Sequence, residues 1–296
     1  MLFEVTRLAN NKKALAVLLV LVMCLLLSGC SKPESKPSQP PAQQQKPPAP
    51  AAMEQMIKEA EKVTMILGQQ YQKQKQKLPS QSVPQAPRQT GTETSSGTQQ
   101  SGEKKSPGGQ SQPNMGKEND PWSNINQSIS KLHRYWNEIE PPAVEAGLDN
   151  TTRDMVKSSL NDLALAIAAR DLETSLMASI GLDQGFAGLA RVFSTPLPAD
   201  YFLLRHQVMA AMVEAGAGRW AEAIEREPLL SRYWDNLKVQ ARGIQPRLLD
   251  RTDFSVGDLQ DALSGQSLEL VAIKGEILLN NLKSLAKEFT RRTAGS

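Results

Sequence analysis

Hydrophobic residues recur at intervals of three and four along most of the chain from Asp120 onward, and this spacing is typical of amphipathic helices. The clearest run predicts a helix that begins at Asp120-Pro121, a capping residue with a helix-starting proline, and stops at Pro141-Pro142. The apolar face of this helix carries Trp122, Ile125, Ile129, Leu132, Trp136 and Ile139. No convincing alternation of a strand interrupts the pattern, which therefore predicts an all-α domain over residues 120–296.

Further helices are predicted over residues 150–169 and 172–194. A break at Ser194–Asp200, which reads STPLPAD, precedes a connector helix within residues 198–217. Gly181, Gly185 and Gly188 lie in the helix 172–194, where glycine lowers helix propensity. We expect these glycines to let two helices approach closely; a ligand lying against the bare backbone is the alternative.

The segment 220–291 repeats the pattern of residues 122–194. A shift of 98 residues pairs all four tryptophans of the chain: Trp122 with Trp220, and Trp136 with Trp234. Beyond the first helix a shift of 96 residues continues the alignment, which places the length change between the first two helices. We therefore predict a bundle of about seven helices, built from two tandem three-helix repeats and the connector. Chance similarity explains aligned apolar faces but not the paired tryptophans.

Each predicted repeat is too small to bury a large core alone. A unit of about 70 residues buries a smaller fraction of its surface than a domain of about 170 residues, which buries roughly 70%. We therefore expect the two copies to pack together through the faces that carry the tryptophans and phenylalanines.

A separate amphipathic helix is predicted over residues 52–78, with acidic residues towards its start and lysines at its end, as the helix dipole favours. This helix either docks on the main domain or is marginally stable alone; the alternative is self-association, or binding to a membrane or partner. The segments on either side, 30–51 and 79–119, are rich in Pro, Gln, Ser and Gly, and we expect them to be disordered. As a flexible coil the second segment spans about 35 Å.

The first 29 residues combine a basic start, an apolar run from Ala14 to Leu27 and small residues, which is the pattern of a secretory signal peptide. Leu27-Ser28-Gly29-Cys30 resembles the lipobox of bacterial lipoproteins. The resemblance implies cleavage between Gly29 and Cys30, a diacylglycerol on the Cys30 thiol, and anchoring to membrane lipid on the extracytoplasmic face of the cell membrane. An ordinary signal peptide with a chance cysteine, or an uncleaved anchor, is the alternative.

Charge divides unevenly along the chain. Residues 31–115 carry 11 Lys and Arg against 6 Asp and Glu, whereas residues 116–296 carry 20 against 24. An exported, mildly acidic domain is an unlikely partner for nucleic acid, so we expect none. The basic segment favours anionic lipid heads or wall polymers, although solubility alone also explains such a composition.

Candidate chemistry is sparse. Cys24 lies within the predicted signal peptide, so the mature chain keeps no cysteine except the lipidated one. His133 and His206 are the two histidines, and neither belongs to a metal-binding spacing; we expect His206 to be a hydrogen-bonded structural residue. Nucleophile and phosphate-loop motifs are also absent from the sequence. We therefore predict no catalytic residue, metal or cofactor, and a protein that is not an enzyme.

Two functions fit this description. The first is an anchored binding or scaffold module whose helical domain contacts an envelope protein or a wall polymer. The second is a receptor for a small ligand or metal, with a pocket between the two repeats. Its candidate lining residues are Tyr135, Trp136, Tyr233 and Trp234.

Overall fold

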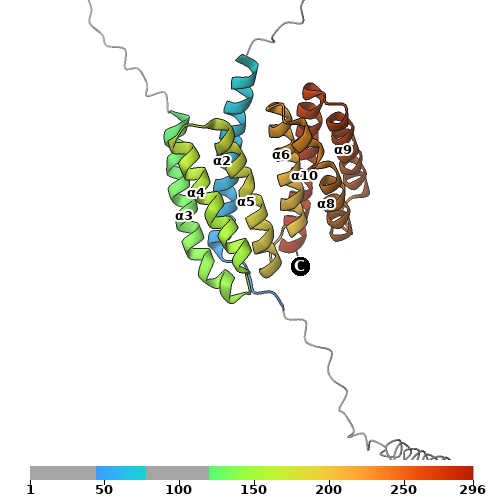
Figure 1. Ribbon diagram of the computed structural model, residues 1–296. Coiled ribbons are helices and arrows are strands. Elements are labelled where there is room, and N and C mark those ends of the chain that lie inside the picture. The colour runs from blue at the N-terminus through green and yellow to red at the C-terminus, as the bar shows by residue number, and fades with distance from the viewer. Residues whose placement is uncertain (1–44, 78–119, 296) are drawn as a thin grey trace, which may run out of the picture. The chain divides into compact units, whose positions relative to one another are not determined.

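The computed structural model describes residues 45–77 and 120–295, and this part of the chain is helical throughout apart from its turns. The all-α prediction is therefore confirmed (Figure 1). The helices are α2 (Ala51–Lys77), α3 (Pro121–Glu145), α4 (Asn150–Ala168), α5 (Leu172–Val192), α6 (Ala199–Gly216), the short α7 (Trp220–Ile224), α8 (Glu227–Gln240), α9 (Pro246–Ser264) and α10 (Leu268–Ala294).

The helices form two four-helix bundles that lie side by side. In the first half α2 contacts α3, α3 contacts α4, α4 contacts α5, and α5 contacts α2. In the second half α6, α8, α9 and α10 make the same closed circuit, and α5 and α6 join the two halves (Figure 1). One further helix completes each predicted three-helix unit: α2 packs with α3–α5 in the first half, and the connector α6 packs with α8–α10 in the second.

The buried faces of α2 and α6 follow the same spacing. Both helices begin 148 residues apart, at Ala51 and Ala199. At this shift five of the seven buried residues of α2 meet a buried residue of α6: Met53 with Tyr201, Met56 with Leu204, Ala60 with Val208, Val63 with Ala211, and Leu67 with Ala215. The amphipathic helix predicted at 52–78 thus docks in the core, because three amphipathic helices alone leave an apolar face open to water.

The turns also repeat. Arg170 and Gln266 are the described residues other than glycine that have positive φ, at 55° and 49°, and they lie 96 residues apart. Each precedes the residue that caps the next helix, Asp171 for α5 and Ser267 for α10. Two amphipathic helices that are similar by chance do not share a positive φ at matched positions, because that backbone conformation is unfavourable for residues other than glycine. The matched turns therefore support duplication.

Burial agrees with the predicted alignment of the later helices. At a shift of 96 residues, six buried residues of α4 and α5 meet buried residues of α9 and α10: Leu160 with Val256, Leu163 with Leu259, Ile167 with Leu263, Leu182 with Leu278, Leu189 with Leu285, and Phe193 with Phe289. Each bundle therefore uses the same positions for its core.

The two halves do not meet through their tryptophans. They join where α5 lies against α6, with the rings of Phe186 and Phe202 5.9 Å apart. Trp136 on α3 and Trp234 on α8 are instead buried within their own bundles. The predicted tryptophan interface is thus wrong, because each tryptophan completes the core of a closed four-helix circuit and has no face left for the other half.

The predicted helix stop at Pro141-Pro142 is wrong. Both prolines lie inside α3, which continues to Glu145. The end is set instead by Gly147, whose φ of 93° suits glycine, and by Leu148, whose backbone N–H donates to the carbonyl of Ala143 at 2.8 Å. These bonds satisfy the last carbonyls of the helix, and burial of Leu148 holds the turn in place.

The predicted tether 30–51 extends too far into the folded part. The Ser194 backbone N–H donates to the carbonyl of Pro47 at 2.8 Å, and the Lys46 ammonium donates to the carbonyl of Ala190 at 3.1 Å. The folded unit therefore begins at Lys46, where the chain lies against the end of α5. The second predicted disordered segment, 79–119, lies outside the described residues.

Close approach of α4 and α5 depends on two of the predicted glycines. A Cβ on Gly185 would overlap the side chain of Val156, and one on Gly188 would overlap the side chain of Thr152. Gly181 has ordinary space, since its nearest neighbour would be Ser159 at 3.4 Å. The prediction of close helix approach is confirmed at Gly185 and Gly188.

Candidate functional site

A groove of about 570 Å³ lies between the two halves, walled by α2 and α5 on one side and by α6 and α10 on the other. Most of the surface along it is apolar, and three of the lining side chains are methionines. The apolar lining residues include Ala60, Met65, Leu176, Ile180, Met209 and Met212. The groove exists because the two closed bundles pack mainly along α5 and α6, and the flanking helices α2 and α10 diverge from that line.

An ion-paired arginine forms part of the groove wall. Arg205 of α6 donates from Nε to Oδ2 of Asp183 at 2.8 Å and from Nη2 to Oδ1 at 2.5 Å, and it also bonds Glu61 of α2. Burial disfavours the charged guanidinium, but Asp183 outweighs this effect and holds the pKa of Arg205 well above its ordinary value. The three charges therefore connect α2, α5 and α6 at one place and leave Arg205 little capacity for another anion.

Tyr71 of α2 also lines the groove. Its hydroxyl donates to the carbonyl of Val213 on α6 at 3.3 Å. Burial raises the pKa of Tyr71 to about 12, so the phenol stays protonated as this bond requires. Gly216 lies against the ring, and a Cβ there would come within 3.0 Å of the hydroxyl oxygen.

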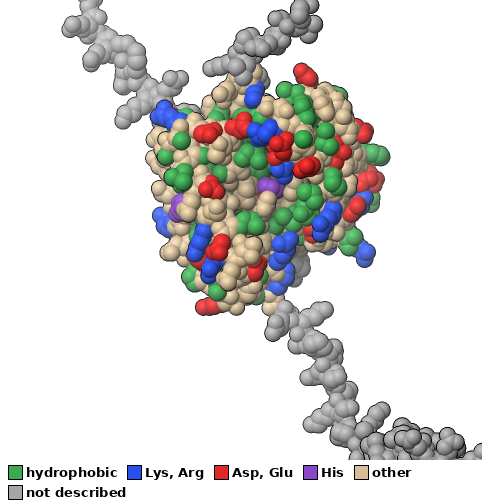
Figure 2. Space-filling model, viewed as in Figure 1, with side chains coloured by type: hydrophobic (Ala, Val, Ile, Leu, Met, Phe, Trp, Pro, Cys, Tyr) green, Lys and Arg blue, Asp and Glu red, His purple; other side chains and the backbone are tan. Residues whose placement is uncertain are grey.

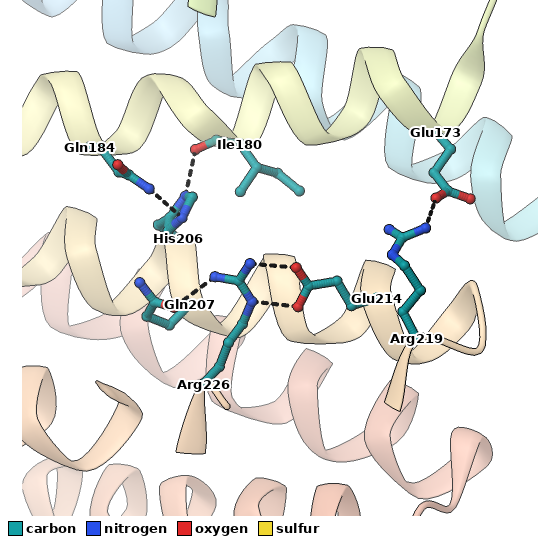
Figure 3. Close-up of polar contacts among 8 residues, drawn as sticks. All are labelled: Glu173, Ile180, Gln184, His206, Gln207, Glu214, Arg219 and Arg226. Carbon is teal, nitrogen blue, oxygen red and sulfur yellow. Dashed lines mark hydrogen bonds and ion pairs between the residues drawn. The ribbon is translucent and has the colours of Figure 1, made fainter. Parts of the chain in front are cut away.

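Behind the groove, a polar layer links α5 and α6 (Figure 3). His206 lies between two α5 groups, with Nδ1 at 3.1 Å from the carbonyl of Ile180 and Nε2 at 2.6 Å from the amide nitrogen of Gln184. Burial lowers the pKa of His206, although the Ile180 contact opposes this effect. The prediction that His206 is a hydrogen-bonded structural residue is confirmed.

Arg226 extends the polar layer into the second half. Its guanidinium forms a two-point pair with Glu214, whose side chain is 7% exposed, and donates from Nη1 to Gln207 at 2.8 Å (Figure 3). Arg219, at the end of α6, bonds Glu173 of α5. Across residues 45–77 and 120–295 no group of three or more His, Cys, Asp or Glu side chains is placed to hold a metal ion.

The candidate ligand residues predicted from sequence are not brought together. Tyr135 and Trp136 lie on α3, and Tyr233 and Trp234 lie on α8, in different bundles. In Figure 1 α3 lies at the outer edge of the first half, and α8 lies beyond α6 and α10. None of the four lines the groove. A pocket built from both copies of the motif is therefore not formed, because each copy faces its own core.

One charged pair of the groove can be recognised in the sequence, although it lies within apolar helix faces. Asp183 lies in the otherwise apolar and small stretch of α5, and Arg205 interrupts the apolar start of α6. Opposite charges in two apolar helices predict a buried pair, since an isolated charge is costly to bury. The predicted cleavage and lipidation residues, Gly29 and Cys30, lie outside the described part of the chain.

No protein-family model, curated protein or solved structure matches this chain. Within the described ranges, no helix has the length and apolar character needed to cross a membrane. The fold and the groove therefore define the molecule as a pair of fused four-helix bundles with a binding-sized groove between them.

Proposed function

We propose that this protein is a lipid-anchored extracytoplasmic binding module of a bacterial envelope, in which the groove between the two halves receives an apolar segment of an envelope protein. The lipobox-like Leu27-Ser28-Gly29-Cys30 supports anchoring through Cys30. The observation that carries the binding role is the apolar, methionine-rich wall of the groove, because such a surface favours an apolar partner over a polar wall polymer.

A protein segment fits the groove better than a small molecule does because apolar surface continues outside it. Met65, at the groove wall, is 58% exposed, and Ile273 and Ile277 of α10 are exposed beside Glu276 at the rim. Leu270, Ile273 and Ile277 recur at helical spacing on the open side of α10. An amphipathic helix that entered the groove would cover this stripe as well.

Photo-cross-linking in intact cells tests the groove. A photoreactive amino acid at Met65 is expected to give an adduct with a defined envelope protein. The same group at Leu165 of α4, which is 70% exposed and far from the groove wall, is expected to give none. Equal adducts at both positions would contradict a groove-specific partner.

A groove-filling variant sharpens the test. Gly68 lines the groove and has no atom within 4 Å of an added Cβ, so a side chain can begin there without a clash, and Gly68→Phe is designed to fill the site. We expect this variant to remove the Met65 adduct at an unchanged Tm. Gly257→Phe on α9, also in open space, is the matched control and is expected to leave the adduct intact.

Anchoring has its own test. Cys30→Ser is expected to move the protein from the membrane fraction to the medium or periplasm, because the acyl chains are the proposed attachment. Retention of the variant in membranes would show that another segment holds the protein there.

A receptor for a small apolar ligand is the second candidate, since a volume of about 570 Å³ lies in the range of small-molecule sites. A ligand that binds only the folded protein raises Tm, and the rise grows with the logarithm of ligand concentration above Kd. A ligand that raises the Tm of the unmodified protein but not that of Gly68→Phe would favour this function over partner binding.

A further inference from the structure

The end of the folded unit at which the described chain begins is rich in cations. Lys283, Lys287 and Arg291 recur every four residues along the last turns of α10, and Arg292 follows them. Lys46 lies close by, since Lys46 and Phe289 line the same hollow. The start of the described chain and the end of α10 are thus neighbours at one end of the bundles, as Figure 1 shows.

These cations border a second groove of about 890 Å³. Its floor is apolar and includes Pro48, Ala49, Ile57 and Leu197, while Lys58, Lys283, Lys287 and Arg291 stand along it. Of its carboxylates, Glu54 is paired with Lys58 and Glu61 with Arg205. Neither Lys283 nor Lys287 forms an ion pair with a described residue, and both are exposed.

The opposite end of the second half has the opposite sign. Glu222, Glu225, Asp258, Asp261 and Glu269 lie on or near the distal turns of α7, α9 and α10. In Figure 2 acidic side chains gather over the upper part of the second half, away from the two ends of the described chain. The second half is therefore electrically polarised along its helices, with its basic end where the described chain begins.

We propose that the basic end, defined by Lys46, Lys58, Lys283, Lys287 and Arg291, rests on an anionic lipid bilayer and holds the bundles upright on it. This inference rests on the proposed lipid anchor at Cys30. Gln45 lies fifteen residues beyond Cys30, and a fully extended chain of that length spans about 50 Å.

The short connection decides which surface meets the membrane. The linker that joins the proposed lipid anchor to Lys46 keeps this end at high effective concentration near the lipid headgroups. The acidic end of the second half faces away from the anionic lipids, which repel it. Lysines near an anionic surface are attracted within about one Debye length, roughly 10 Å at 0.1 M salt. Bound in this way, the bundles present the far end and the groove to partners beyond the membrane.

Depth-dependent fluorescence quenching tests the orientation. The lipidated protein is reconstituted into phosphatidylcholine vesicles with or without about 30% phosphatidylglycerol, an anionic lipid that attracts clusters of Lys and Arg. Because the mature chain keeps no free thiol, Ala294→Cys places one label at the basic end and Leu268→Cys places one at the other end of α10. A headgroup-bound quencher is expected to quench the Ala294 label several-fold more with phosphatidylglycerol, and the Leu268 label in neither lipid.

Charge reversal supplies the control. Lys283→Glu with Lys287→Glu is expected to abolish the phosphatidylglycerol-dependent quenching, as is high salt. Lys73→Glu with Lys75→Glu makes the same charge change near the far end of α2 and is expected to leave it intact. Equal quenching of both labels, or quenching that ignores phosphatidylglycerol, would overturn the inference.

The two proposals fail in different ways. If Cys30 carries no lipid, the protein does not float with phosphatidylcholine vesicles at all. If the basic end does not contact the bilayer, the protein floats but its two labels respond alike.

Discussion

The two halves have the same order of helices, but the contact between the first and second helix of each bundle uses side chains of different charge. In the repeat alignment Glu59 of α2 corresponds to Gln207 of α6, and Ser128 of α3 corresponds to Arg226 at the start of α8. In the first half the Ser128 hydroxyl donates to Glu59 at 2.5 Å. In the second half Arg226 donates to Gln207 at 2.8 Å. Both bundles place a hydrogen bond between their first and second helices at the same position.

The surroundings of each contact explain why the charged residue lies on the first helix of one bundle, as Glu59, and on the second helix of the other, as Arg226. Burial raises the pKa of Glu59, but bonds from Ser128 and Lys62 outweigh this effect and keep the pKa below its ordinary value. Lys62 and Lys131 balance Glu59 from positions that remain in water. The second helix of the other bundle instead meets α6, which is covered by both halves, so Arg226 requires the buried Glu214 as its partner.

The strongest test of this comparison is Arg226→Met. It leaves the Glu214 carboxylate buried without a cation, and breaking a buried pair costs about 3–5 kcal/mol. The matched change in the first half, Ser128→Ala, removes one hydrogen bond but leaves Lys62 and Lys131, so we expect about 1 kcal/mol. Urea unfolding of both variants measures the difference. Equal losses would show that the two contacts have the same surroundings.

A second difference lies between the last two helices of each half. Gly185 lets α5 approach α4 closely, whereas the aligned residue of α10 is Asn281. Asn281 is buried and donates to Ser255 of α9 at 3.0 Å and to the carbonyl of Arg251 at 3.3 Å. One half thus holds these helices by close backbone approach and the other by a hydrogen-bonded amide.

We expect Gly185→Ala to destabilise the protein by about 1–3 kcal/mol, because the new methyl group overlaps Val156 between two fixed helices. Gly257→Ala on α9 has open space and is expected to stabilise by about 0.5–1 kcal/mol through helix propensity. Thermal and urea unfolding compare the two. A stabilising Gly185→Ala would mean that α4 and α5 can separate freely.

The paired tryptophans differ in one bond. Trp136 and Trp234 are similarly buried, at 5% and 2% exposure, but Trp234 Nε1 donates to Asp253 at 2.6 Å while Trp136 Nε1 has no partner among the described residues. Lys238 and then Trp234 hold the pKa of Asp253 below its ordinary value. The aligned position in the first half is Lys157, which pairs with Glu140 and offers no acceptor.

Replacing each tryptophan by phenylalanine isolates this bond. Both changes remove similar ring area, but only Trp234→Phe loses a hydrogen bond, so we expect it to cost about 1 kcal/mol more than Trp136→Phe. The readout is the midpoint of urea unfolding. If Trp136→Phe were the more harmful change, its indole nitrogen would have an unrecognised partner.

The smallest expected effect concerns pH. Burial lowers the pKa of His206, so the unfolded chain takes up a proton at higher pH than the folded protein does. Stability is therefore complete above the ordinary histidine pKa of about 6.5 and falls as pH drops towards the lowered value. Between pH 7.5 and 5, Tm is expected to fall, and His206→Gln to flatten this slope.

The helices themselves were predictable from sequence because apolar spacing and caps are local properties. The predicted ranges 150–169 and 172–194 lie within two residues of α4 and α5. The end of α3 could not be predicted in this way. The Pro141-Pro142 pair predicts that the helix ends there, but the helix continues because Ala143 and Leu148 are buried in the core. Local preference is worth less than the core contacts that the extra turn makes.

The sequence by itself determined helix positions, the duplication and the residues of each core face, because these follow from spacing along one chain. Only the tertiary structure decided that α2 joins the first bundle across a long intervening segment and that α6 opens the second. It also decided that the repeated tryptophans face separate cores while Asp183, Arg205 and Glu61 meet at the groove. Spacing shows which face of a helix is buried, but the partner of that face depends on closing the whole circuit of helices.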